Sequence, residues 1–392
     1  SLGELAGERM KVALEANSTE DEHDCFSDNT HNSHFYDAKG IRNVYLGEYT
    51  RTDGSKMTGA SLSSLVAKAD PLRLRLDADN GVIFAISPNG EVEAYRGKQR
   101  LWQKKVSKQG LSSGVEAAEG LVIVGSSKGQ LYALDQASGE EKWTAQLSGA
   151  ILAPSLIHAG RVISIANDGT VYAHEAATGK QAWTYNLPNV QFSLRGQAAP
   201  VPLDARNVLI ASSNAYIYAL DAISGAPKMQ RRVAVSEGRS DIQRLIDIDG
   251  DPAVAGQFVV TASYQGQVTV LDLVSQQVVW SEDASSIQRP EVQGNGVFVA
   301  QTDGKITAYE ITTGNKLWEN DQLLNRQLSN PVMLDGDLVV GDLDGVLHLL
   351  NPATGEITGR AKTSGEVRTL RVIDGQLYAA TRKGAMSVWQ NR

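Results

Sequence analysis

The sequence is poor in cysteine, in long apolar runs and in positive charge. Its 392 residues include one cysteine, Cys25, which excludes an intramolecular disulfide and a cysteine-rich zinc site. No apolar run approaches the roughly 18 residues of a membrane-spanning helix, and Ser1 opens no signal peptide, so we expect no spanning segment. The net charge is −8, with 37 Lys and Arg against 45 Asp and Glu, which makes nucleic acid an unfavourable partner.

What the sequence does contain is a repeat. Four clear copies lie at residues 120–143, 160–183, 256–280 and 295–318, and four weaker ones at 81–102, 206–229, 336–359 and 375–390. Each copy has short alternating apolar runs separated by turn sequences such as SKG, NDG and ATG, which is typical of antiparallel strands joined by tight turns. Three to four strands in a period of about 40 residues match the blade of a β-propeller. We therefore predict an all-β, eight-bladed propeller.

Two positions mark the copies. The first is a turn glycine, found as Gly90, Gly129, Gly169, Gly266, Gly304, Gly345 and Gly384, with Ala215 in its place in the fourth copy. The second, 14 residues later, is a tryptophan in most copies but Met229 in the fourth and Gly359 in the seventh; in the first copy Trp102 follows after only 12 residues, so a turn is shortened there. Because one sheet cannot bury both of its faces alone, we interpret the tryptophans as packing between blades. Stacking on a ligand is the alternative.

Two connections between copies are longer than the rest. The tryptophan position is normally followed by the next marker after 24 to 27 residues, but the distance is 32 from Trp183 to Ala215 and 37 from Met229 to Gly266. Both insertions flank the fourth copy. Insertions in a repeat fold form surface loops, and loops on a rigid scaffold often carry binding residues.

The insertions contain VQFSLRGQAAP (190–200) and SEGRSDIQRLIDIDGDP (236–252). We expect them to bring Phe192, Leu194 and Arg195 close to Asp247 and Asp249 on adjacent blades. An apolar anchor beside an arginine is a common composition for a protein-binding hot spot. The spacing leaves open a second interpretation, in which Arg195 pairs with an aspartate and only holds the two loops together.

Four segments, FSLRGQAAP, GRSDIQRLIDIDGDP, LLNRQLSNPV and VGDLDGVLHLLNPATG, go beyond a generic blade repeat. Through them, residues 71–392 resemble the BamB family, the propeller lipoproteins of the bacterial outer-membrane β-barrel assembly machine. The resemblance implies a non-enzymatic scaffold without a cofactor, at the periplasmic face of the outer membrane. It implies binding to the POTRA domains of the barrel-forming subunit through Phe192, Leu194, Arg195, Asp247 and Asp249, with unfolded outer-membrane proteins as further partners.

The sequence also departs from that family. Members carry a signal peptide and a lipidated cysteine ahead of the propeller, and this chain shows neither, so a lipid anchor is not expected from it. Members also have about one more strand before PLRLRLDADNGVIFAI, and this strand joins the last blade. Here the last copy stops just past its third strand, so we expect ring closure to need a strand from upstream of Pro71.

Residues 1–70 do not contain the repeat, and we assign them to a separate domain. A helix is expected over LGELAGERMKVALEA, and the motifs AGERMKVALE, DEHDCFSDNTH and IRNVYLGEY resemble the imelysin family, mainly helical periplasmic proteins of the M75 peptidase class linked to iron uptake. The family's GxHxxE motif, its proposed metal-ligand signature, is missing from the chain. The missing motif argues against the family's metal or peptidase activity in this fragment. We expect the fragment to be joined, either artificially or by an unusual gene fusion, near Ala69 to Pro71 to the propeller of residues 71–392.

Within that fragment, His23, Cys25, Asp28, His31 and His34 lie within twelve residues. Such a density suggests a metal site, but the spacing fits no standard zinc pattern, and Asp28 is equally suited to cap a helix or turn. A metal site and a structural role both stay open, with His23, Cys25, His31 and His34 as weak candidate ligands.

Two other functions fit the repeat. The pattern YALDxxTGxxxW also occurs in quinoprotein dehydrogenases, which bind pyrroloquinoline quinone in a propeller, but a chain with one cysteine outside the repeat cannot supply the adjacent cysteine pair that many of them use. The propeller could also bind peptides generally, by adding a strand to an exposed blade edge.

Overall fold

The computed structural model describes residues 48–50, 56–58, 77–79, 81–87, 90–97, 99–108, 110–188, 197–234, 248, 250–264, 266–382 and 385–389. The chain divides into two compact units, Ser1–Asp70 and Pro71–Arg392. In the first unit, β1 (Glu48–Thr50) pairs antiparallel with β2 (Lys56–Thr58). The helix expected at the start of the chain and the candidate ligands His23, Cys25, His31 and His34 lie outside the described residues.

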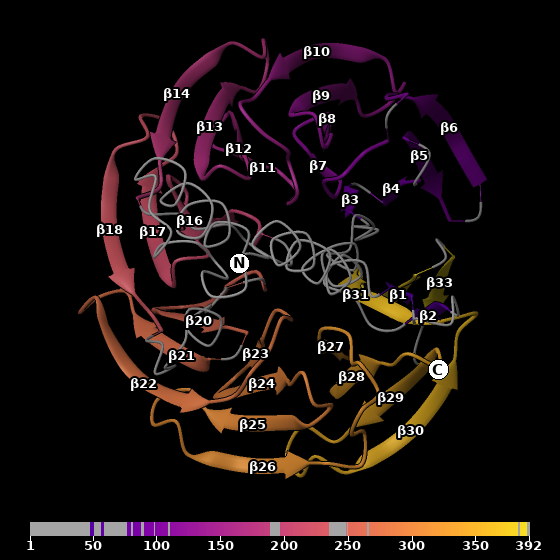
Figure 1. The fold of residues 1–392 in the computed structure, drawn as a ribbon, viewed down its shortest axis with the longest axis vertical. Helices are drawn as coiled ribbons and strands as arrows, with labels where there is room; N and C mark the ends of the chain where they lie inside the picture. Colours follow the sequence, from indigo (N-terminus) through magenta and orange to yellow (C-terminus); the bar gives the residue numbers. More distant parts are fainter. Residues whose placement is uncertain are drawn as a thin grey trace, which may run out of the picture. The chain divides into compact units, whose positions relative to one another are not determined.

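The second unit confirms the predicted β-propeller with eight blades (Figure 1). The blades are I (β3 Asp77–Asp79, β4 Val82–Ile86, β5 Glu91–Arg96, β6 Gln99–Lys105), II (β7 Glu116–Ala118, β8 Leu121–Gly125, β9 Gln130–Asp135, β10 Glu141–Gln146), III (β11 Leu156–His158, β12 Arg161–Ile165, β13 Thr170–Glu175, β14 Gln181–Asn186), IV (β15 Val201–Pro202, β16 Asn207–Ala211, β17 Tyr216–Asp221, β18 Pro227–Arg232), V (β19 Ala253–Ala255, β20 Phe258–Ala262, β21 Gln267–Asp272, β22 Gln277–Asp283), VI (β23 Glu291–Gln293, β24 Gly296–Ala300, β25 Ile306–Glu310, β26 Lys316–Asn320), VII (β27 Val332–Leu334, β28 Asp337–Gly341, β29 Val346–Leu350, β30 Ile357–Lys362) and VIII (β31 Val367–Ile373, β32 Gln376–Thr381, β33 Met386–Trp389). Within the described residues, blade VIII has three strands and each other blade has four. The same residues form no helix long and apolar enough to cross a membrane.

The antiparallel order of each blade places its connections on two opposite faces of the propeller. The first strand of a blade is innermost and the fourth lies at the rim, as β6, β10, β14, β18, β22, β26 and β30 do in Figure 1. The turns after the first and third strands therefore share one face. The turn after the second strand and the connection to the next blade share the other, which we call the connection face.

The hydrophobic core is divided among the junctions between blades. At the II–III junction, Leu131 and Trp143 pack with Ile157 and Val162, whereas Leu134, on the opposite face of β9, packs towards blade I. Neighbouring blades thus bury both faces of a sheet, each large side chain contributing about 1.5–3 kcal/mol. The VIII–I cluster is the smallest of these junction clusters in the described part of the chain, with Ile83 and Tyr378 as its buried members.

Five junctions share one tryptophan contact, which confirms packing between blades as the role of these residues. The indole Nε1 atoms of Trp102, Trp143, Trp183, Trp280 and Trp318 donate to the carbonyl oxygens of Gln136, Ala176, Ala222, Ile311 and Pro352 in the next blade, at 2.7–3.1 Å. The same rings cover Gly139, Gly179, Gly225, Gly314 and Gly355, where an added Cβ would lie 2.4–2.8 Å from the indole. The φ angles of these glycines are 71° to 77°, so both the space and the backbone exclude a larger residue.

The IV–V junction lacks this tryptophan–glycine contact. Met229 takes the tryptophan position, and Gln276, with φ of 56°, takes the glycine position. Arg231 joins them by donating from Nε to the Gln276 carbonyl oxygen at 2.8 Å and from Nη2 to Gln276 Oε1 at 3.1 Å. A polar contact therefore supplements the packing of Met229 at this junction.

Six of the turn markers adopt the left-handed backbone of a tight turn. Gly90, Gly129, Gly169, Gly304 and Gly345 have φ of 78° to 96°, and Ala215, which replaces glycine in the fourth copy, has φ of 63°. The turn that is two residues shorter in the first copy is also present, because Arg96 pairs directly with Gln99. Alignment of the copies therefore predicts the local backbone even where the residue type differs.

Candidate functional site

Both sequence insertions leave the propeller on the connection face. One joins β14 to β15 and the other joins β18 to β19, and each of these links a rim strand to the innermost strand of the next blade. Phe192, Leu194, Arg195, Asp247 and Asp249, the residues predicted for binding, lie outside the described residues. What the structure shows is the framework from which the insertions start and to which they return.

The ends of the two insertions are attached to each other. The backbone N–H of Ala199, at the end of the first, donates to Asp251 Oδ1, at the end of the second, at 2.7 Å. Ala198 and Ile248 are both about 1% exposed and belong to the same core cluster at the IV–V junction. At the start of the first insertion, Asn214 Nδ2 donates to the carbonyl oxygen of Pro188 at 2.7 Å. The described ends of the two insertions are therefore held next to each other on the propeller.

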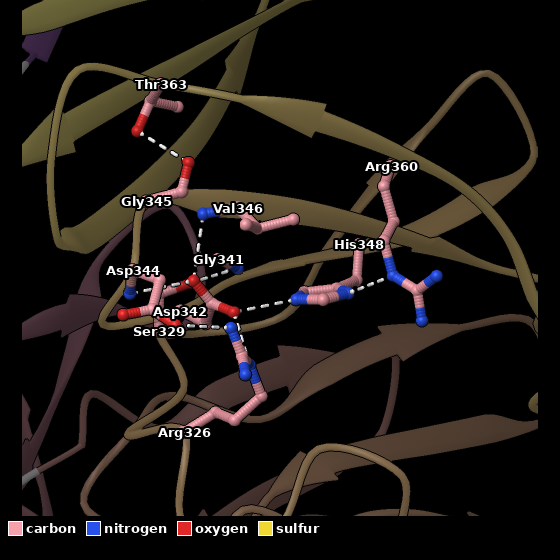
Figure 2. A network of polar contacts seen from close by, with 10 residues as sticks. All are labelled: Arg326, Ser329, Gly341, Asp342, Asp344, Gly345, Val346, His348, Arg360 and Thr363. Atoms are coloured by element: carbon pink, nitrogen blue, oxygen red, sulfur yellow. Dashed lines mark hydrogen bonds and ion pairs between the residues drawn. The ribbon is translucent and has the colours of Figure 1, made fainter.

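A second polar arrangement on the connection face is centred on the buried carboxylate of Asp342 in blade VII (Figure 2). Its Oδ1 accepts the backbone N–H groups of Asp344 and Val346 at 3.0 and 2.8 Å. Its Oδ2 accepts Arg326 Nε at 2.6 Å and lies 2.9 Å from His348 Nε2. The carboxylate is therefore fully hydrogen-bonded, as a buried charge must be.

Burial and hydrogen bonds set the charges in this network. Burial alone would raise the pKa of Asp342, but the bonds from His348, the Val346 N–H and Arg326 outweigh it and hold that pKa below its usual range. Burial lowers the pKa of His348, although Asp342 acts in the opposite direction. Since Arg360 Nε donates to His348 Nδ1 at 3.3 Å, we assign a neutral ring with its proton on Nε2.

The network also joins two blades. Arg326 lies in the connection from blade VI to blade VII, between Asn325 and Gln327, whose φ angles of 62° and 49° are left-handed. Asn325 N–H donates to Asp303 O in blade VI at 2.7 Å, and Leu343 N–H in blade VII donates to Arg326 O at 2.9 Å. Two uncommon backbone conformations thus hold the arginine where it reaches Asp342.

This arrangement is suited to structure and not to catalysis. The second ring nitrogen of His348 contacts Arg360 and not a hydroxyl or thiol, so Asp342 and His348 do not activate a nucleophile. In the part of the chain that the structure describes, no three His, Cys, Asp or Glu side chains gather to hold a metal ion. What the connection face offers is a surface on which the ends of two insertions are held together.

Sequence reasoning did not identify this network, although a signal was present. Asp342 stands where blade II has Ser126, whose Oγ accepts the same kind of turn N–H groups at 3.0–3.3 Å. His348 stands where blade II has Tyr132. Two ionisable residues at positions that are polar but neutral in another copy could have indicated a local ion pair, but not that Arg326 would complete it.

Taken together, the fold and the connection face define a non-catalytic repeat propeller of the kind that serves as a binding scaffold. The family model described as "Outer membrane protein assembly factor BamB" matches residues 79–320 and 302–391. The chain belongs to the BamB family. This family is named for assembly and not for an enzymatic reaction, in agreement with the expectation from sequence.

Relatives and solved structures agree with this assignment. The BamB assembly factor of Salmonella typhimurium is 34% identical over 311 residues, which cover 78% of this chain and 79% of that protein. The one from Escherichia coli K12 is 34% identical over 323 residues, covering 79% and 82%. The crystal structure of BamB from Moraxella catarrhalis has a TM-score of 0.77 and 36% identity, and covers 82% of this chain and 97% of that one. The designed protein Ika8, at 17% identity and a TM-score of 0.65, shares the fold alone.

The beginning of the chain matches a different family. The imelysin family model, Peptidase M75, matches residues 1–83. The predicted resemblance of this segment to imelysin is thereby confirmed.

Proposed function

We propose that the chain is a scaffold subunit of the outer-membrane β-barrel assembly machine, at the periplasmic face of the bacterial outer membrane. It binds the POTRA domains of the barrel-forming subunit and so assists the assembly and insertion of outer-membrane proteins. Membership of the BamB family and the names of the relatives as outer membrane protein assembly factors support this function.

We propose that the two insertions form the binding surface, with Phe192 and Leu194 as apolar anchors and Arg195, Asp247 and Asp249 as charged partners. The hydrogen bond from Ala199 to Asp251 is the observation that carries this proposal, because it fixes the ends of the insertions next to each other. The burial of Ile248, the covalent neighbour of both aspartates, attaches the second insertion to the core at the same place. A preformed base reduces the entropy lost on binding.

The test is a titration of the purified full chain with the POTRA domains. Arg195→Ala and Asp249→Ala should each weaken binding by about tenfold, as expected for hot-spot residues, without lowering the melting temperature. Lys228→Ala is the matched control, since this exposed lysine lies near the start of β18, on the face of the propeller opposite the insertions. Unchanged affinity in both insertion variants would contradict the site. A lower melting temperature with unchanged affinity would show instead that the two residues only hold the loops together.

We also propose that residues 1–70 are a separate imelysin-like fragment joined to the propeller near residues 69–71. The division of the chain between Asp70 and Pro71 supports this boundary. Mass spectrometry of the protein produced from its native locus provides the test. A tryptic peptide spanning residues 69–73 would show that the joining is natural, and its absence beside other peptides from both segments would show that it is not.

A further inference from the structure

The junction between blades V and VI is hollowed on the face opposite the connection face. A cavity of about 630 Å³ lies there between three turns, those that join β19 to β20, β23 to β24 and β25 to β26. Phe258, Val292 and Ile311 form its apolar walls, and all three pack in the core cluster of the V–VI junction. The cavity therefore extends the hydrophobic core to the surface. Its volume is within the range of about 300–1,000 Å³ that is usual for ligand pockets.

At the I–II junction a polar pair bridges the corresponding positions. Gln136 Nε2 of blade II donates to Asp79 Oδ2 of blade I at 3.0 Å. Ile311 holds the position of Gln136, seven residues before the tryptophan of its blade. Ala255 holds the position of Asp79, the last residue of the first strand. Both Ile311 and Ala255 line the cavity, so an apolar pair takes the place of the bridge.

Exposed valines continue this apolar surface on blade V. Val274, in the turn from β21 to β22, is 79% exposed, the highest value among the exposed large hydrophobic side chains that the structure describes. Its neighbour Leu273 donates its N–H to the carbonyl oxygen of Gln257, a residue that lines the cavity, at 2.8 Å. Val278 and Val279, at the start of β22, are 43% and 41% exposed. Contiguous exposed apolar residues beside a cavity are typical of an interaction site.

The polar groups around the cavity indicate which partner fits. Gln257, Asn295 and Thr312 supply amide and hydroxyl groups, and none of the described residues that line the cavity is charged. A charged headgroup or side chain would lose its water there without gaining a partner. A lipid acyl chain would leave the amide and hydroxyl groups unused. A peptide suits both, because its backbone bonds to amides and hydroxyls while an apolar side chain fills the cavity.

An extended peptide also matches the patch beside the cavity. In an extended segment every second side chain points to the same face, so one apolar side chain enters the cavity and the next one contacts Val274. The strands of membrane β-barrels have this alternation of apolar and polar residues, since one face contacts lipid and the other the lumen.

We propose that the V–VI cavity and Val274 bind an extended, uncharged segment of an unfolded outer-membrane protein. The proposal rests on the proposed function, which supplies outer-membrane proteins as clients. It places the client on the face opposite the insertions, so that the POTRA domains and a client are bound at the same time.

The test uses the full chain and a fluorescein-labelled ten-residue peptide in which leucine and phenylalanine alternate with threonine. The double variant Ala255→Asp, Ile311→Gln introduces the polar pair of the I–II junction and should weaken binding of this peptide by about tenfold or more. It should fold, because Trp102 bonds to Gln136 O at I–II as Trp280 bonds to Ile311 O here. A peptide with lysine at every apolar position should not bind.

A second variant tests the exposed patch without changing a buried residue. Val274→Ser should weaken binding of the alternating peptide by at least about threefold. Leu101→Ser is the matched control, because Leu101 is an exposed aliphatic residue, 42% exposed, on the rim strand of blade I. Its affinity should stay within about twofold of the unchanged protein. An equal loss in both serine variants would mean non-specific adsorption and would overturn the proposal.

Other outcomes would overturn it as well. One is equal affinity of the double variant and the unchanged protein for the alternating peptide. Another is a dimer, seen by sedimentation, that the double variant dissociates while the peptide does not bind, since a second copy would then occupy the cavity. A third is binding to phosphatidylethanolamine–phosphatidylglycerol vesicles that the double variant loses while the peptide does not bind, which would assign the cavity to lipid.

Binding to POTRA domains separates this proposal from the proposed function. The double variant should leave that affinity unchanged, and Arg195→Ala should leave peptide binding unchanged. Unchanged POTRA binding in Arg195→Ala contradicts the insertion site alone, whereas unchanged peptide binding in the double variant contradicts the cavity alone.

Discussion

The III–IV and IV–V junctions use the same two positions of the repeat in different ways. At III–IV, Trp183 donates to Ala222 O and covers Gly225. At IV–V, Met229 replaces the tryptophan, Gln276 replaces the glycine, and Arg231 donates twice to Gln276. Tryptophan and glycine therefore change together, because an indole ring at this position leaves no space for a Cβ. The IV–V junction, which carries both insertion ends, depends less on this packing and more on polar contacts.

The largest expected difference between these junctions follows from removing the large side chain. Trp183→Ala should lower the free energy of unfolding by about 3–5 kcal/mol, since it leaves a cavity and an unpaired Ala222 carbonyl. Met229→Ala should cost less, about 2 kcal/mol, because methionine is smaller and makes no such hydrogen bond. Urea unfolding followed by circular dichroism measures both. Equal losses would mean that the tryptophan–glycine contact contributes nothing beyond its counterpart at IV–V.

Most of this comparison could be predicted from the sequence. The constant distance of 14 residues between markers places Met229 opposite the tryptophans, and the structure pairs it with Ala219 as Trp183 pairs with Ala173. The eight copies likewise predict eight blades, and the last copy contains the three strands that the described residues of blade VIII form. A repeat gives this information because each copy repeats the same contacts.

The contacts that occur once could not be predicted in this way. Arg231 and Gln276 are 45 residues apart, and Arg326 and Asp342 are 16 apart, with no second copy to show that either pair meets. The binding residues proposed in the insertions are of the same kind, since no repeat constrains where Arg195 and Asp249 lie. The breaks in the repeat spacing located the insertions, and resemblance to a family assigned these residues to POTRA binding.

A smaller effect concerns the II–III junction, where a titratable ring packs against the tryptophan. His174 is 3% exposed and stacks between Trp143 and Tyr172, with centroid distances of 6.2 Å to each. Burial lowers the pKa of His174 below its ordinary value of 6.5. The unfolded chain therefore binds a proton more readily than the folded one, so stability is retained above about pH 6.5 and falls as the pH decreases below it.

His174→Phe should remove this part of the acid sensitivity while keeping the aromatic stack. Between pH 8 and pH 5 the variant should lose less free energy of unfolding than the unchanged protein, by about 1.4 kcal/mol for each unit by which burial lowers the pKa. Unfolding in urea at the two pH values measures the difference. His348 and Asp342 are present in both proteins, so their contributions cancel. An identical loss in both proteins would show that His174 binds its proton as easily when folded.

The smallest effect is expected at Ala215, where blade IV departs from the repeat a second time. Its φ of 63° costs about 1–2 kcal/mol for a residue with a Cβ. Ala215→Gly would relieve that strain, but it would also lose a buried methyl group, worth about 0.8 kcal/mol, and add about 0.5–1 kcal/mol of chain entropy to the unfolded state. These terms nearly cancel, so the melting temperature should change by less than about 2 °C.

The reverse change in blade II, Gly129→Ala, should be clearly destabilising, because its Cβ would lie 2.6 Å from Gly149 O and 2.7 Å from Leu147 O. If Gly129→Ala also changed the melting temperature by less than about 2 °C, the space beside the turn would not decide where the repeat accepts alanine, and backbone strain alone would.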